Sequence, residues 1–106
     1  MKTTIEQLEG YTLVTLDGKL DTAASVEVKK TLAPLMENGS GNIVIECKDL
    51  SYIASSGLRI LLSILKSTKA NGGKLTLRNV NDKVNKIFSL TGFVKIFDFE
   101  YNLIVI

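Results

Sequence analysis

The segment of this sequence most suited to chemistry is Ser55-Ser56-Gly57, which stands just before a leucine-rich stretch. Hydroxyl side chains at the start of a helix commonly cap it, because their oxygens accept hydrogen bonds from free N–H groups of the first turn. A glycine at such a position lets another part of the chain approach closely. We therefore expect Ser55 or Ser56 to cap a helix, which by itself is a complete structural explanation of the segment.

The same position is also suited to phosphorylation. The unpaired amides and the positive end of the helix dipole both favour a phosphate at a helix N-terminus. A phosphate on Ser55 would carry a charge of about −1.5 to −2, and a partner pocket shaped for a neutral hydroxyl would have to desolvate it. Phosphorylation of Ser55 is therefore expected to change binding and to leave the fold intact.

The first third of the chain predicts an antiparallel hairpin followed by a helix. Polar and apolar residues alternate loosely from Thr3 to Leu16, and Glu9-Gly10 interrupts them as a tight turn would. After this hairpin the apolar residues recur at helical spacing, with Thr22 available as the N-cap. Pro34 cannot donate to the helical ladder, so a kink or an early end near Ala33 is expected.

The middle of the chain predicts a buried strand and a buried helix. Ile43-Val44-Ile45 is a continuous β-branched run, which is typical of a central strand covered on both faces. From Ser55 onward, apolar residues recur at helical spacing until Asn71-Gly72-Gly73. The segment between this strand and this helix is expected to be a loop that carries the two serines.

The last third predicts a strand, a short helix and a final strand. The strand covers Lys74 to Leu77, the helix covers Asn81 to Leu90 and stops near Gly92, and a last apolar run covers Leu103 to Ile106. Strands that alternate with helices build a mostly parallel sheet through right-handed crossovers. The fold class predicted is α/β: a single mixed, mostly parallel sheet with an N-terminal antiparallel hairpin and helices packed on it.

Length and composition predict one globular domain covering residues 1–106. The 13 basic and 11 acidic residues are scattered and give a net charge of +2, which argues against a nucleic-acid partner. Cys47 is the single cysteine, so no disulfide framework exists and a reducing, cytoplasmic location is expected. The sequence has no apolar run of membrane-spanning length, so no membrane association is expected.

Several enzyme classes are disfavoured by residues that the sequence lacks. It has no histidine and no Gly-x-Ser-x-Gly motif to activate a serine nucleophile. It also lacks the glycine-rich run ending in Gly-Lys-Ser or Gly-Lys-Thr that binds nucleotide phosphates. Cys47 has no neighbour in the sequence that would lower its pKa, so a packed side chain is expected there. We predict no catalytic residue, no metal site and no cofactor.

Three segments resemble one known family, the STAS domain, and within it the bacterial anti-sigma-factor antagonists. Residues 49–58, with the sequence Asp-Leu-Ser-Tyr-Ile-Ala-Ser-Ser-Gly-Leu, look like the phosphorylation loop of that family. Gly18-Lys19-Leu20-Asp21 looks like its Gly-Glu-Leu-Asp segment after the second strand, and Leu90-Thr91-Gly92-Phe93 looks like the turn after its third helix. The similarity covers almost the whole chain with matching spacing.

The resemblance implies a switch controlled by phosphorylation. The unphosphorylated protein would bind a serine-kinase anti-sigma factor and so free a sigma factor. That kinase would phosphorylate Ser55 and break the complex, and a metal-dependent serine phosphatase would reverse the modification. Asp21 would lie across the loop from Ser55 and face the kinase; the alternative for this residue is an acid that complements the dipole at a helix start. The implied partner-binding residues are Asp21, Thr22, Ala54, Ser56, Gly57, Leu58 and Arg59.

The sequence departs from the family pattern in three places. Ala54 replaces an acid that often precedes the phosphoacceptor, so the field at Ser55 is less negative and a different kinase preference is expected. Lys19 replaces a common acid and changes the charge pattern of the expected interface. The terminal helix of the family is expected to be short or absent in this chain. Arg59 has two interpretations, a contact with the partner or phosphate and a solvated surface side chain.

The alternative function is a STAS scaffold subunit of a lipid-transport or stress-signalling complex without a phosphorylation cycle.

Overall fold

The computed structural model describes residues 1–101 and contains one mixed sheet with its helices. The elements, in chain order, are β1 (Lys2–Leu8), β2 (Tyr11–Leu20), α1 (Thr22–Asn38), β3 (Asn42–Glu46), β4 (Leu50–Ile53), α2 (Ser55–Ala70), β5 (Lys74–Arg78), α3 (Asp82–Thr91), the 3-10 helix η1 (Phe93–Lys95) and β6 (Asp98–Glu100). The strands are ordered β1-β2-β3-β5-β6, and β4 pairs with β2. Among the strands of residues 1–101, only the β1–β2 hairpin is antiparallel, as the sequence predicts.

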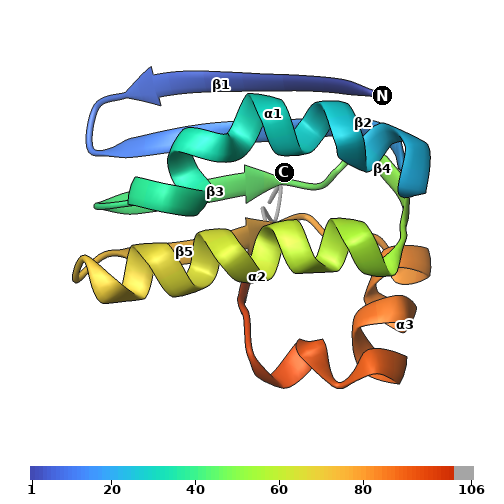
Figure 1. Ribbon diagram of the computed structural model, residues 1–106. Helices are drawn as coiled ribbons and strands as arrows, with labels where there is room; N and C mark the ends of the chain where they lie inside the picture. The colour runs from blue at the N-terminus through green and yellow to red at the C-terminus, as the bar shows by residue number, and fades with distance from the viewer. Residues whose placement is uncertain (102–106) are drawn as a thin grey trace, which may run out of the picture.

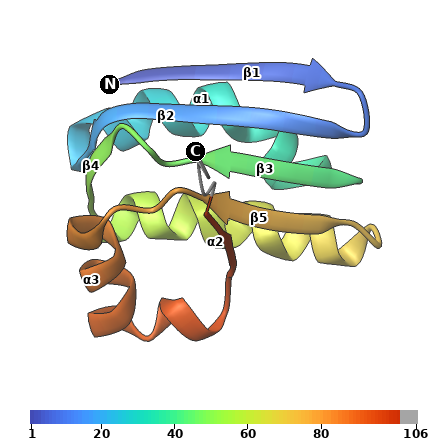
Figure 2. The same ribbon diagram turned by 180° about the vertical axis from the view of Figure 1, so that it is seen from behind.

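Helices α1 and α2 lie side by side on one face of the sheet (Figure 1), and the view from behind shows the strands in front of them (Figure 2). Their apolar faces and the facing side of the sheet form the core, which includes Leu16, Leu32, Ile45 and Leu61 at 0% exposure. Burial of this apolar surface is the main favourable term in folding. No helix within residues 1–101 combines the length and the apolar character that a membrane span needs.

Strand β2 is long because it pairs with two different strands in succession. Its first half is in register with β3, from Thr12 opposite Ile43 onward, and its second half is in register with β4. The register shifts between Gly18 and Lys19, where the backbone of Gly18 has a φ of +113° that favours glycine. This irregularity turns the end of β2 toward β4.

Helix α3 begins and ends with the residue types that favour helix termini. The side chain of Asn81 accepts a hydrogen bond from the amide of Val84 at 3.0 Å, and its own amide group donates to the carbonyl of Leu50. Gly92 ends the helix in the left-handed conformation, with a φ of +80°. The predicted stop at Gly92 is confirmed, and the helix itself is one residue displaced from its predicted range.

Of the two effects expected of Pro34, a kink or an early end near Ala33, the early end does not occur, because α1 continues through Pro34 to Asn38. Leu32 is fully buried on one side of the proline, and Leu35 and Met36 pack against the core on the other side. Pro34 itself is exposed, so the carbonyl that loses its helical partner can be hydrated. Packing on both sides therefore outweighs the loss of one hydrogen bond.

Two strand predictions need correction. The central strand β3 is covered fully on one face only: Ile43 and Ile45 are buried, whereas Val44 between them is partly exposed. The expected loop after β3 contains the short strand β4, and the chain adds β6 before its end. The strand predicted at Leu103–Ile106 lies outside the described residues.

Candidate functional site

The candidate site forms where two neighbouring parallel strands end and two helices begin. Leu20 at the end of β2 pairs with Ile53 at the end of β4, and the amide of Ala54 donates to the carbonyl of Leu20 at 2.8 Å. The next residue in each segment, Asp21 or Ala54, is the N-cap of a helix. The N-termini of α1 and α2 therefore meet at the carboxyl end of the sheet, where open α/β folds usually bind ligands (Figure 1).

Asp21 caps α1. Its side chain accepts a hydrogen bond from the amide of Ala24 at 2.8 Å, and its carbonyl accepts the amide of Ser25 at 3.0 Å. The prediction that Thr22 caps this helix is wrong, because Thr22 is already the first helical residue. The carboxylate of Asp21 remains exposed, so a capping role leaves it accessible from outside.

A hydrogen bond between Ser25 and Ser56 joins the first turns of the two helices. Their hydroxyl oxygens lie 2.8 Å apart, and the hydroxyl of Ser25 also lies 2.8 Å from the carbonyl of Asp21. A serine hydroxyl has one proton. Since the Asp21 carbonyl can only accept, Ser25 donates to it and Ser56 donates to Ser25. The single proton of Ser56 therefore points inward, toward α1.

Ser55 differs from its neighbour because its side chain is exposed. The prediction that one of the two serines caps α2 is wrong: Ala54 is the N-cap, and no side chain within residues 1–101 accepts a capping hydrogen bond there. The first turn of α2 thus keeps free N–H groups beside Ser55. These groups and the helix dipole favour negative charge at this end of the helix.

Gly57 and Leu58 lie beneath this surface. A Cβ atom on Gly57 would approach Leu20 Cγ to 2.7 Å and Ile53 Cγ1 to 2.9 Å, so glycine allows α2 to pack directly on the two strand ends. Leu58 is 2% exposed and belongs to the core. Both residues support the position of Ser55 from below, and Arg59, the next residue, is exposed.

A shallow cleft of about 460 Å³ lies next to the helix starts and is lined by Lys19, Asp21, Ser51 and Tyr52. Lys19 and Tyr52 are partners in the β2–β4 register, and both are exposed. The hydroxyl of Ser51 donates to the carbonyl of Gly18 at 3.1 Å. The lysine that departs from the family pattern therefore lies on the same surface as Asp21.

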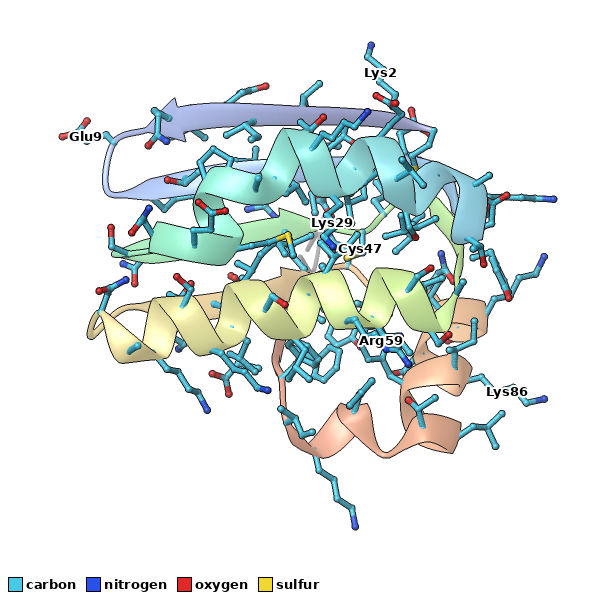
Figure 3. The ribbon with its side chains drawn as sticks, viewed as in Figure 1. Lys2, Glu9, Lys29, Cys47, Arg59 and Lys86 are labelled. Atoms are coloured by element: carbon cyan, nitrogen blue, oxygen red, sulfur yellow. The ribbon has the colours of Figure 1, made fainter. Side chains whose placement is uncertain are left out.

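A second concave surface, of about 350 Å³, runs between α1 and α2, and we call it the interhelix groove. It is lined by Thr22, Ser25, Val26, Lys29, Met36, Ser56, Arg59, Ile60 and Ser63. Figure 3 labels the two cations, Lys29 on α1 and Arg59 on α2. Because Ser56 lines the groove and follows Ser55 directly, the groove is continuous with the surface around the exposed serine.

Cys47 takes no part in this site. The thiol is fully buried, and burial, with a smaller contribution from the charge of Glu46, raises its pKa to about 12. A thiol with so high a pKa is a poor nucleophile at neutral pH. The expectation of a packed side chain is confirmed for the folded protein.

Of the residues singled out from the sequence, the structure brings Asp21, Thr22, Ser55 and Ser56 together at the two helix starts. Sequence reasoning missed Ser25, whose hydroxyl connects them. The signal available was a serine three residues after the expected cap Thr22, on the face that carries Val28 and Leu32 into the core. Such a serine is also typical of an ordinary helix position, so the signal was weak.

The matching family model is the STAS domain, which covers residues 2–104. The chain therefore belongs to the STAS domain family. Among curated relatives, an anti-sigma-B factor antagonist of Bacillus subtilis is 32% identical over 94 residues, which cover 89% of this chain and 85% of the relative.

Solved structures agree with the fold. A STAS domain protein of Planctomyces limnophilus, described as an anti-sigma-factor antagonist, superposes with a TM-score of 0.82 at 14% identity and covers 94% of this chain and 89% of its own. The phosphorylated form of the Bacillus cell fate determinant SpoIIAA superposes with a TM-score of 0.73 at 19% identity, covering 96% and 92%. At these identities the likeness extends to the fold.

Proposed function

We propose that this protein is an anti-sigma-factor antagonist that binds a serine-kinase anti-sigma factor and is released from it by phosphorylation of Ser55. The observation that carries the proposal is the difference between the two serines: Ser55 is exposed beside an uncapped helix start, whereas the proton of Ser56 is committed to Ser25. The family, and the printed function of the Bacillus subtilis relative, support the same class of protein.

The binding surface proposed consists of exposed and partly exposed residues around Ser55. Asp21 and Thr22 contribute from α1, and Ala54, Ser56 and Arg59 from the start of α2. Gly57 and Leu58 contribute indirectly, because they set the position of that helix start. A partner that covers this surface would exclude water from Ser55, so a phosphate added there would have to lose its hydration in the complex.

A phosphate on Ser55 would be tolerated by this domain. Free amides of the first turn of α2 favour it, and Arg59 lies four residues further on, which is one turn along the same helix face. The proposed switch therefore acts on the complex while the fold stays intact. A metal-dependent serine phosphatase would restore the unmodified hydroxyl. The cytoplasmic location of the protein stays a prediction.

Phosphate mapping tests the proposal. The purified protein would be incubated with ATP and the serine-kinase anti-sigma factor encoded nearest to its gene, and modified peptides would be identified by mass spectrometry. We expect phosphate on Ser55 alone, no incorporation in Ser55→Ala, and incorporation confined to Ser55 in Ser56→Ala. Phosphate on Ser56, or none at all, would contradict the proposal, and the second result would favour a scaffold without a phosphorylation cycle.

The effect of charge on binding is a second test. Ser55→Asp should weaken the complex with the same kinase by roughly 2–5 kcal/mol, the cost of a buried interfacial charge without a partner. Ser55→Asn is the matched control, because asparagine has the shape of aspartate without its charge. The Ser55→Asn variant should bind the kinase more tightly than Ser55→Asp. Equal affinity of the wild type and Ser55→Asp in calorimetry would exclude the mechanism.

A further inference from the structure

The interhelix groove combines apolar walls with positive charge. Ile60 is buried in its floor, Met36 is partly buried, and Val26 is 57% exposed on the α1 side. Lys29 and Arg59 are exposed and line the groove from opposite helices (Figure 3). An apolar depression rimmed by polar side chains is a feature of protein interaction sites.

The charge of the groove is not neutralised within the part of the chain that the structure describes. No aspartate or glutamate is among the residues that line it. Across residues 1–101 the ion pairs are Glu27 with Lys30 and Glu46 with Arg78, so Lys29 and Arg59 have no acidic partner. The groove therefore presents two unpaired cations around an apolar depression.

From this charge and shape we infer that the groove receives an acidic segment of the partner kinase, with one large apolar side chain seated between α1 and α2 and carboxylates facing Lys29 and Arg59. The inference rests on the proposed function, because it extends the surface around Ser55 along the two helices. The shape favours a protein segment over a free small ligand, because ligand pockets enclose most of the ligand surface, whereas Val26, Lys29 and Arg59 on this groove are exposed.

The position of Met36 distinguishes a partner that occupies the interhelix groove from a partner that binds around Ser55 alone. Met36 lies in the last turn of α1, far along that helix from Ser25. A partner confined to the helix starts would not reach it, whereas a segment that follows the groove would. The chain has two methionines, Met1 and Met36, so methyl signals of labelled methionine give one probe inside the groove and one reference outside it.

The first experiment follows the methionine methyl resonances of the full chain by NMR while the purified serine-kinase anti-sigma factor is added. We expect the Met36 signal to shift or broaden in step with complex formation. The same titration with Ser55→Asp should leave both signals unchanged at equal concentrations. A complex that forms while the Met36 signal stays unchanged would overturn the inference and leave the proposed function standing.

The second experiment measures affinity after charge reversal. Lys29→Glu should weaken the complex about tenfold at low salt, with a smaller loss at high salt, because exposed charges at an interface are screened. Lys86→Glu is the matched control: Lys86 is exposed on α3 and points away from the groove (Figure 3). It should change the affinity less than twofold.

Val26→Asp removes an apolar side chain from the groove and adds a negative charge, which should repel an acidic partner segment. Val26 is exposed, so the change should leave the thermal unfolding midpoint within a few degrees while weakening the complex about tenfold or more. Wild-type affinity in both Lys29→Glu and Val26→Asp would overturn the inference. Absence of any complex with the wild-type chain would instead contradict the proposed function, and the inference with it.

Discussion

The hydroxyls of Ser25 and Ser56 lie 2.8 Å apart although 31 residues separate them in the chain. This contact links the first turn of α1 to the first turn of α2 and continues to the carbonyl of Asp21. It orients one of two adjacent serines inward and leaves the other, Ser55, exposed. A residue on a different helix therefore determines which of the two hydroxyls is exposed, and so which of them we propose as the site of modification.

Removing this contact should cost stability without touching the exposed serine. Ser56→Ala is expected to lower the free energy of unfolding by about 0.5–1.5 kcal/mol, the usual net value of a hydrogen bond. Ser55→Ala is the matched control and should change it by less than about 0.5 kcal/mol, because its side chain is exposed. Urea unfolding followed by circular dichroism measures both; equal losses would contradict the assigned hydrogen bond.

Gly57→Ala should destabilise the protein although alanine is the better helix former. An added Cβ would lie 2.7 Å from Leu20 Cγ and 2.9 Å from Ile53 Cγ1, and overpacking of this kind costs about 1–3 kcal/mol. Helix propensity alone predicts a gain of about 1 kcal/mol. The sign of the change in urea unfolding decides between the two effects, and a more stable variant would refute the close packing described at the start of α2.

Asp21 has two separable roles, as a helix cap and as a proposed partner contact. Asp21→Ala should destabilise the fold by about 0.5–2 kcal/mol, because the amide of Ala24 loses its acceptor. Asp21→Asn keeps an oxygen that can cap the helix and should remain close to wild type in stability. If Asp21→Asn binds the kinase more weakly at unchanged stability, the charge of Asp21 itself contributes to binding. If the affinity of Asp21→Asn equals that of the wild type, the charge of Asp21 does not contribute to binding and helix capping is its remaining role.

Cys47 should make stability fall in alkaline solution. Its pKa in the folded protein is raised to about 12 by burial, so the unfolded chain releases this proton at lower pH than the folded one. The contribution of the neutral thiol is fully present below about pH 9 and is lost as pH rises toward 12, by up to about 1.4 kcal/mol per pH unit.

Comparison with the variant Cys47→Ala separates the effect of thiol ionisation on stability from that of lysine and tyrosine titration, because both proteins share the lysines and tyrosines. The variant should be less stable than the wild type at pH 8, because a buried side chain is truncated. The difference in unfolding free energy between the two proteins should then shrink as pH rises above 9. A difference that stays constant to pH 10.5 would show that the thiol ionises equally in both states.

Much of the fold follows from local patterns. The broken alternation around Glu9-Gly10 predicts the β1–β2 hairpin, and the apolar run at Ile43–Ile45 predicts a strand at the centre of the sheet. The leucine-rich period after Ser55 predicts α2. These elements depend on residues close together in the chain, so they can be predicted from the sequence without knowledge of the tertiary structure.

Other elements depend on partners that the pattern does not reveal. Strand β4 is only four residues long and exists because the end of β2 is free to pair with it. Pro34 remains helical because the residues on both sides of it pack into the core. In both cases a tertiary contact overrides a weak local preference.

By itself, the sequence determined the class of fold, the family resemblance and the segment that we propose for phosphorylation, because residue types and short spacings encode them. Only the tertiary structure decided which serine is exposed, which residues cap the two helices, and that Lys29 and Arg59 line one groove. Those outcomes depend on the pairing of β2 with β4, which places two distant helix starts side by side. Contacts between segments so far apart in the chain have no local signal, since each segment alone is compatible with several partners.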